Sequence, residues 1–182
     1  RLLYREHKVS VKRGQLQTDR FSKDEITPIL MGLYGEVGSI MATSKKFYRE
    51  KKAYAGHRAA VEEEFGDAFW YLSALCRRLS INMESMFESI CNLTSPRHYI
   101  PGAEEAKSSV SKELDAALID LGCATAQLLG NKENTSFLRK EVSNVARLYC
   151  NALKLTGLDF CKVVEGNLTK TLGRFSTPDP TK

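Results

Sequence analysis

Hydrophobic residues recur three and four positions apart along most of this chain, which is the spacing that places them on one face of an α-helix. The sequence SKDE at 22–25 is a capping box, with Ser at the cap and Glu three positions later, and Pro28 falls in the turn that follows. We therefore expect a first long helix over about 24–48. The same spacing predicts further helices over about 57–79, 83–93, 104–129, 137–155 and 160–175.

Turn chemistry and composition support the same fold class. Asn82 and Asp159 each precede a predicted helix, where a side-chain oxygen caps the first turn. Only 12 glycines and 5 prolines occur in 182 residues, which favours long helices over an all-β fold, and 42% hydrophobic residues are enough for a sizeable core. The sequence predicts an all-α protein, a helical bundle.

The second half of the chain echoes the first at an offset of 77 residues. Helix phases and a turn coincide without a gap, which favours a diverged tandem repeat. Two amphipathic hairpins of similar length are the alternative. A true repeat predicts two similar helical units packed about a pseudo-two-fold axis. The aligned acidic positions are Glu36 with Glu113, Glu64 with Glu141, and Asp67 with Asn144.

These patterns divide the chain into five segments. The expected segments are a lead-in at 1–21, a first repeat at 22–95 with the acidic residues, a linker at 96–103, a second repeat at 104–175 and a tail at 176–182.

Charge and hydropathy narrow the function classes. Mean hydropathy is −0.32 and no apolar run approaches the ~20 residues of a membrane span, so we expect no membrane partner. The net charge of +5 suits an anionic ligand and gives no reason to expect specific nucleic-acid binding. Five cysteines without a CxxC pair predict reduced core residues of an intracellular protein, and no signal peptide is visible, so a cytoplasmic location is expected.

Three carboxylates stand out against the apolar pattern. Glu64 and Asp67 are three positions apart and share a face of the second predicted helix, while Glu36 lies on the first. Buried charge is costly unless it is paired or binds a metal, so these acids either sit in solvent at the edge of the apolar stripe or hold a cation. Oxygen donors with no His or Cys nearby favour Mg²⁺, or Mn²⁺, over Zn²⁺.

Cationic residues on the last predicted helix complement these acids. Lys170 and Arg174 are four apart and share a face with Asn167 one turn before Lys170. Acids in one half and cations in the other predict one composite site, and the implied chemistry is metal-assisted attack of water on a phosphoanhydride. The basic connector at 45–58 is either a solvated loop or a rim that attracts phosphate.

The stretches GLYGEVGS at 32–39 and EEEFGDAFWYL at 62–72 resemble the MazG-like all-α nucleoside triphosphate pyrophosphohydrolases, whose signature is ExxE, a spacer and ExxD. The ending NLTKTLGRF resembles that family's closing Asn, Lys and Arg element. The resemblance implies a helical bundle, in a tandem form similar to the all-α dUTPases, that cleaves an NTP or dNTP to the monophosphate and pyrophosphate. It implies catalytic metal ligands at Glu36, Glu64 and Asp67 and substrate contacts at Asn167, Lys170, Arg174 and Tyr71.

One position departs from the family pattern. Ser39 stands where the second Glu of ExxE is expected, and Ala116 stands there in the second repeat. A hydroxyl is a poorer Mg²⁺ ligand than a carboxylate. The leading interpretation is a Mg²⁺-dependent pyrophosphohydrolase, the second a nucleotide-binding or assembly module on the same scaffold, and the third a bundle without a ligand. The sequence leaves open whether two chains form a homodimer.

Overall fold

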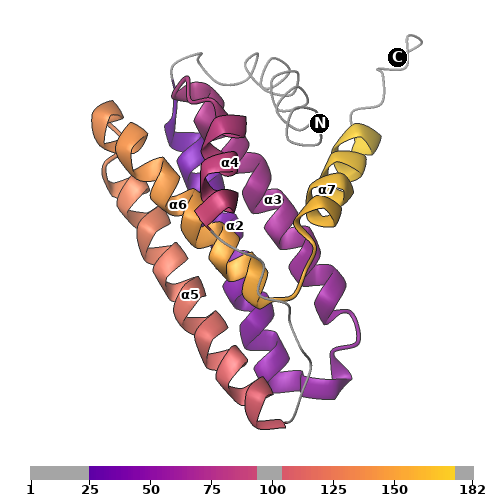
Figure 1. Cartoon of the computed structure of the whole chain (residues 1–182). Helices are drawn as coiled ribbons and strands as arrows, with labels where there is room; N and C mark the ends of the chain where they lie inside the picture. The colour runs from indigo at the N-terminus through magenta and orange to yellow at the C-terminus, as the bar shows by residue number, and fades with distance from the viewer. Residues whose placement is uncertain (1–24, 94–103, 175–182) are drawn as a thin grey trace, which may run out of the picture.

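The computed structural model describes residues 25–93 and 104–174, and this part of the chain is helical with no strand (Figure 1). The predicted all-α fold class is therefore confirmed. The expected lead-in, the expected linker and the expected tail lie outside the described residues. The elements are α2 (Thr27–Glu50), the 3₁₀ turn η1 (Lys51–Ala53), α3 (His57–Arg78), α4 (Met83–Leu93), α5 (Glu104–Gly130), α6 (Thr135–Leu155) and α7 (Phe160–Arg174).

The caps predicted from the sequence are present at the N-termini of α4 and α7, and the N-terminus of α2 differs from the prediction. Asn82 Oδ1 accepts from the Ser85 amide at 3.0 Å, and Asp159 Oδ1 accepts from the Lys162 amide at 3.0 Å. Helix α2 begins three residues later than expected, because Ile26 occupies the cap position without a side-chain hydrogen bond and proline follows in the first turn. Ser22 of the expected capping box lies outside the described residues.

The core lies between helices that are distant in sequence. Helix α2 packs against α3 and α5, and α6 packs against α5 (Figure 1). The aromatic rings of Phe65, Phe69 and Tyr149 meet within this core, and the Tyr149 hydroxyl donates to the Phe65 carbonyl at 2.9 Å. Such edge-to-face rings add to the free energy gained by burying apolar area. These contacts fix α3, the helix with two of the three acids, against α6.

The helices repeat along the chain as the sequence predicts. Helices α5, α6 and α7 begin 77, 78 and 77 positions after α2, α3 and α4. The third helix of each set packs against the second helix of the other set, so α7 lies on α3 and α4 lies on α6. A two-fold relation between the halves would produce this exchange, and the pseudo-two-fold axis itself stays a prediction.

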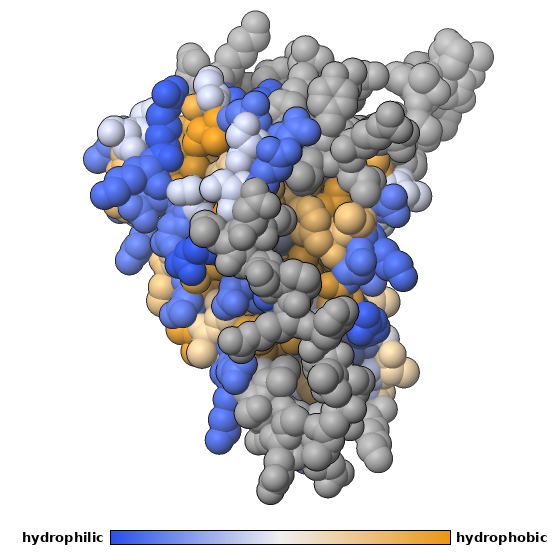
Figure 2. Space-filling view, viewed as in Figure 1, coloured by the Kyte–Doolittle hydropathy of each residue, from blue (hydrophilic) through white to orange (hydrophobic). Residues whose placement is uncertain are grey.

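On the face that Figure 2 shows, hydrophilic side chains of the described part alternate with apolar ones. None of the described helices contains a stretch long and apolar enough to cross a membrane. The expectation that the cysteines are core residues is wrong for Cys123 and Cys161, which are exposed, and right for Cys76, which is buried. Helical periodicity places a residue on a face but does not say whether that face is covered.

Candidate functional site

The acidic residues come together on neighbouring faces of α2 and α3. Glu64 and Asp67 lie one turn apart on α3, and Glu36 extends from α2, the helix that packs beside it. Each of the three is partly buried at the edge of the core. The predicted acidic cluster therefore forms at the boundary between the apolar interior and solvent.

A glycine brings the last helix close to these acids. An added Cβ at Gly66 would lie 2.9 Å from the Asn167 Cβ, so no larger residue fits there unless α7 moves away. Asn167 is 5% exposed, and its Nδ2 donates to Asp67 Oδ1 at 2.7 Å. This contact between α3 and α7 joins the two halves of the chain at the acidic cluster.

Lys170 provides the positive charge of the cluster. Its ammonium group lies within hydrogen-bond distance of both Asp67 oxygens, at 2.5 and 2.6 Å, and of Glu63 Oε1 at 3.1 Å. The Lys170 and Asp67 side chains are 22% and 26% exposed, so this ion pair is partly shielded from water. The predicted meeting of first-half acids with a second-half cation is present for this pair. Glu63 is exposed to solvent and is ion-paired with Lys170.

Burial first, and the negative charge of neighbouring carboxylates second, shift the pKa values of two acids in the cluster. Burial and the charges of Asp67 and Glu64 raise the pKa of Glu36 from 4.5 to about 7. Burial, together with the charges of Asp67 and Glu63, also raises the pKa of Glu64. A hydrogen bond joins the Glu36 and Glu64 carboxyl groups, with Glu36 as the protonated partner. Lys170 lowers both pKa values but does not offset the repulsion.

The oxygen donors fit a hard divalent cation in their chemistry. Three carboxylates with one ammonium group leave net negative charge, and Asn167 Oδ1 is buried without a hydrogen-bond partner. Carboxylate and amide oxygens are Mg²⁺ ligands. Within the described residues, however, no group of three or more Asp, Glu, His or Cys side chains is arranged to hold a metal ion. Lys170 takes both oxygens of Asp67.

Different surroundings are found at Ser39, the position that departs from the family pattern, and at two residues of the predicted site. Ser39 is half-buried on α2, one turn after Glu36. Tyr71 packs against the core beside Gly32, where an added Cβ would lie 2.1 Å from its ring. The helix containing Arg174 ends at this residue, and its side chain lies outside the described part of the chain. Of the predicted substrate-contacting residues, Asn167 and Lys170 contact the acids directly.

The corresponding positions of the second half form no similar cluster. Glu113 is exposed, and Asn144 accepts a hydrogen bond from Arg147 at 2.8 Å. The first-half position that corresponds to Asn167 is Ile90, which is buried and apolar. Among the described residues, the acids of the first half and the amide and ammonium group of the second half therefore come together at one composite site between α3 and α7.

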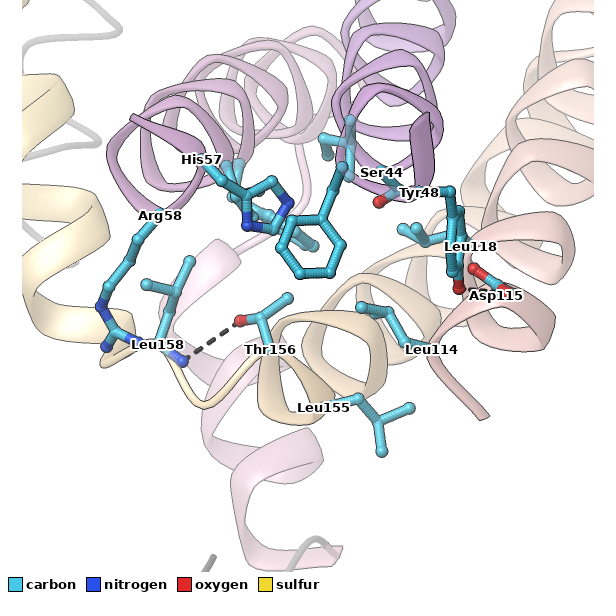
Figure 3. Close-up of a pocket in the computed structure, with 14 residues that line it drawn as sticks. Ser44, Tyr48, His57, Arg58, Leu114, Asp115, Leu118, Leu155, Thr156 and Leu158 are labelled. Carbon is cyan, nitrogen blue, oxygen red and sulfur yellow. Dashed lines mark hydrogen bonds between the residues drawn. The ribbon is translucent and has the colours of Figure 1, made fainter. Parts of the chain in front are cut away.

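Two cavities lie near these elements. One of about 340 Å³ lies between α3 and α7 beside Glu63 and Lys170. The other, of about 290 Å³, lies between the end of α2, the start of α3, the side of α5 and the end of α6 (Figure 3). It brings together residues that no motif indicated, because they come from separate segments of the chain between Ile40 and Leu158.

His57 lines this second cavity. Gly56 occupies the cap position of α3, and the His57 ring packs on Phe47 with the ring centroids 4.3 Å apart. Burial lowers the pKa of His57, so the imidazole is neutral at pH 7. The sequence around His57, a glycine before it and an apolar helix after it, did not predict the contact with Phe47.

Comparison of the chain with protein-family models, with curated proteins and with solved structures returned no match.

Proposed function

We propose that this protein is a Mg²⁺-dependent nucleoside triphosphate pyrophosphohydrolase, which cleaves an NTP or dNTP to the monophosphate and pyrophosphate. The observation that carries the proposal is the cluster in which Glu36, Glu64 and Asp67 of the first half meet Lys170 of the second half. The resemblance of residues 32–39 and 62–72 to the MazG-like family supports this reaction over other phosphoanhydride cleavages.

In this proposal Glu36, Glu64 and Asp67 hold Mg²⁺, with Mn²⁺ as a substitute. The bound ion neutralises triphosphate charge and favours attack by water on the α-phosphorus, with pyrophosphate as the leaving group. Lys170 supports the same chemistry, since its ammonium group has three donors and can hold a phosphate oxygen in place of Glu63 while it still contacts Asp67. Asn167 orients Asp67 through its amide N–H.

Substrate contacts complete the proposed site. Arg174 and Tyr71 are the remaining residues for which the family resemblance implies a role. The cavity of about 340 Å³ beside Lys170 provides space next to the acids. Its lining includes Glu62 and Glu63, which repel phosphate unless a cation intervenes. A metal-bound triphosphate therefore suits this surface better than a free one.

A second candidate is a nucleotide-binding or assembly module without turnover. Ser39 in place of a carboxylate and the engagement of Asp67 by Lys170 favour it. The two candidates differ in one measurable property, which is the release of pyrophosphate.

The test is pyrophosphate release by the purified chain with Mg²⁺ over a panel of NTPs and dNTPs. The repeat provides a matched control, because Glu141 on α6 corresponds to Glu64 on α3. Glu64→Gln is expected to lower kcat/KM at least about 100-fold, by analogy with removing one group that stabilises developing charge, and Glu141→Gln is expected to leave it within about threefold. Asp67→Asn provides a second loss-of-function variant.

Two results would reject the enzyme. Either no nucleotide yields pyrophosphate from folded protein, or Glu64→Gln and Glu141→Gln lower the rate equally. In the first case Mg²⁺-nucleotide binding, measured by calorimetry, distinguishes the binding module from a bundle without a ligand.

The proposal extends to location and assembly. A nucleotide substrate is consistent with a cytoplasmic enzyme. Met31 and Tyr34 on the outer face of α2 are 59% and 46% exposed, which is consistent with a homodimer formed through this helix. Light scattering on the eluting protein measures the mass, and a monomer at all concentrations would reject the homodimer.

A further inference from the structure

The cavity of about 290 Å³ at the end of the bundle is separate from the acidic cluster and draws its walls from both halves of the chain. Figure 3 shows His57 and Arg58 of α3 facing Leu155 and Thr156 at the end of α6, with Leu114 of α5 to one side. The volume is close to the lower end of the roughly 300–1,000 Å³ typical of small-molecule sites. The cavity therefore suits a ring system better than a single ion.

The walls of the cavity favour a flat, aromatic ligand. Four aromatic side chains line it, and aliphatic side chains supply most of the remaining surface. Aromatic rings bind other rings by offset stacking or edge contacts at centroid distances of about 4.5–7 Å. The aromatic residues are Phe47, Tyr48, His57 and Phe65.

The polar groups of the cavity favour a neutral ligand with a hydrogen-bond donor. His57 Nε2 is buried without a hydrogen-bond partner, which is costly unless a ligand or water supplies one. Across the cavity, Asp115 accepts from the Tyr48 hydroxyl at 2.6 Å, and a carboxylate has capacity for further donors. Arg58 lies at the rim and donates to the Gly157 carbonyl at 3.3 Å. One carboxylate and one guanidinium leave the lining close to neutral.

We propose that this cavity binds a neutral heteroaromatic amine of the aminopurine or aminopyrimidine type, with its exocyclic amino group directed to Asp115 or His57. Such a heterocycle carries a donor next to a ring-nitrogen acceptor. Its amino group can donate to the Asp115 carboxylate or to an unprotonated His57 nitrogen, and its ring nitrogens can accept from a protonated one. The inference stands independently of the proposed pyrophosphohydrolase, because none of its residues belongs to the acidic cluster.

The test measures nucleoside binding to the full chain by calorimetry in metal-free buffer. Adenosine and cytidine are compared with inosine and uridine, which replace the amino group by a carbonyl. One hydrogen bond to a charged group corresponds to a preference of about 10-fold for the amino compounds. Equal affinity for amino and carbonyl nucleosides, or no binding of any of them, would overturn the proposal.

Variants locate the binding to this cavity. Ser44→Phe fills the space from α2 and is expected to weaken adenosine at least 10-fold, whereas Ser143→Phe, on the exposed side of α6, is expected to leave the affinity unchanged. His57→Phe keeps an aromatic wall but removes the buried nitrogen, so adenosine binding should fall about 3- to 10-fold. This second variant serves if Ser44→Phe does not fold. Unchanged adenosine affinity in either folded cavity variant would contradict the assignment.

The heterocycle has two sources, the base of a triphosphate or a separate nucleoside, and a competition experiment distinguishes them. If the cavity holds the base of a bound triphosphate, adenosine and Mg²⁺–dATP exclude each other; if it holds a separate nucleoside, both bind together. Either result retains the cavity as a heterocycle site. Pyrophosphate release without nucleoside binding would overturn this inference alone, and nucleoside binding without pyrophosphate release from any nucleotide would overturn the proposed enzyme alone.

Discussion

Replacing Glu36 by Gln should stabilise the protein at alkaline pH and leave its stability unchanged at acidic pH. The carboxyl group titrates at about 7 in the folded protein, against 4.5 for the unfolded chain. Below pH 4.5 it is protonated in both states. Between these values the folded protein keeps a proton that the unfolded chain has released, so the free energy of unfolding falls as pH rises. Above about pH 8 the Glu36 carboxylate is charged in both states, and the free energy of unfolding is lowered by the full amount.

The magnitude follows from the same pKa difference. A fully buried carboxyl group with this difference would destabilise the folded state by about 3.4 kcal/mol at pH 8, at about 1.36 kcal/mol for each factor of ten. Glu36 is partly exposed, and solvent screens much of the repulsion, so we expect about 1–2 kcal/mol. Gln removes the titrating charge and retains an N–H that can donate to Glu64.

The assay is urea denaturation of parent and Glu36→Gln from pH 4.5 to 8.5, with a chelator present. The difference in unfolding free energy should be near zero at pH 4.5 and reach about 1–2 kcal/mol at pH 8 in favour of the variant. Taking the difference removes the opposite pH dependence of His57, whose pKa is lowered. Glu113→Gln, at the exposed corresponding position, should behave like the parent. A pH-independent difference for Glu36→Gln would refute the reasoning.

Three further perturbations follow from contacts in the structure. Gly32→Ala should lower the free energy of unfolding by about 1–3 kcal/mol, because the new Cβ would lie 2.1 Å from the Tyr71 ring. Gly35→Ala has open space around it and should raise the free energy of unfolding by about 0.5–1 kcal/mol through helix propensity. Thermal unfolding of the two variants checks the opposite signs. A double-mutant cycle of Lys170→Met and Asp67→Asn, measured by urea denaturation, should give a coupling free energy of about 1 kcal/mol. Addition of 1 M salt should reduce this coupling. Additive effects of the two substitutions would show that the ion pair contributes nothing to stability. Tyr149→Phe should cost about 1–2 kcal/mol in the same assay, since it removes a buried hydrogen bond to a backbone carbonyl, and an unchanged midpoint would contradict this.

The parts of the fold that the sequence predicted depend on local chemistry. Asn82 and Asp159 cap helices because their side-chain oxygens reach the next turn, and no distant residue is needed for that. The offset of 77 residues likewise anticipated the helix starts, since it compares local patterns with each other. Ile26 shows where local rules fail, because α2 begins after this residue although its side chain cannot cap a helix.

The candidate site was partly predictable for the same reason. Spacing placed Glu64 and Asp67 on one face, and charge complementarity pointed to Lys170. The elevated pKa of Glu36 depends on burial and on the distances among three carboxyl groups, which only the packed structure provides. The cavity beside His57 was not predictable, because it exists only where α2, α3, α5 and α6 pack together.

The exchange of third helices between the halves has a consequence for how such a chain changes over time. In a symmetric dimer every substitution appears twice, so two equivalent centres must change together. In a single chain with exchanged helices, α7 serves the acids of α3, while the reciprocal position of α4 on α6 holds Ile90. The α4–α6 contact is thus released to evolve as scaffold, constrained by volume and hydrophobicity alone, while the α3–α7 contact retains the charged groups. Mutational tolerance should therefore be asymmetric along a chain whose architecture repeats.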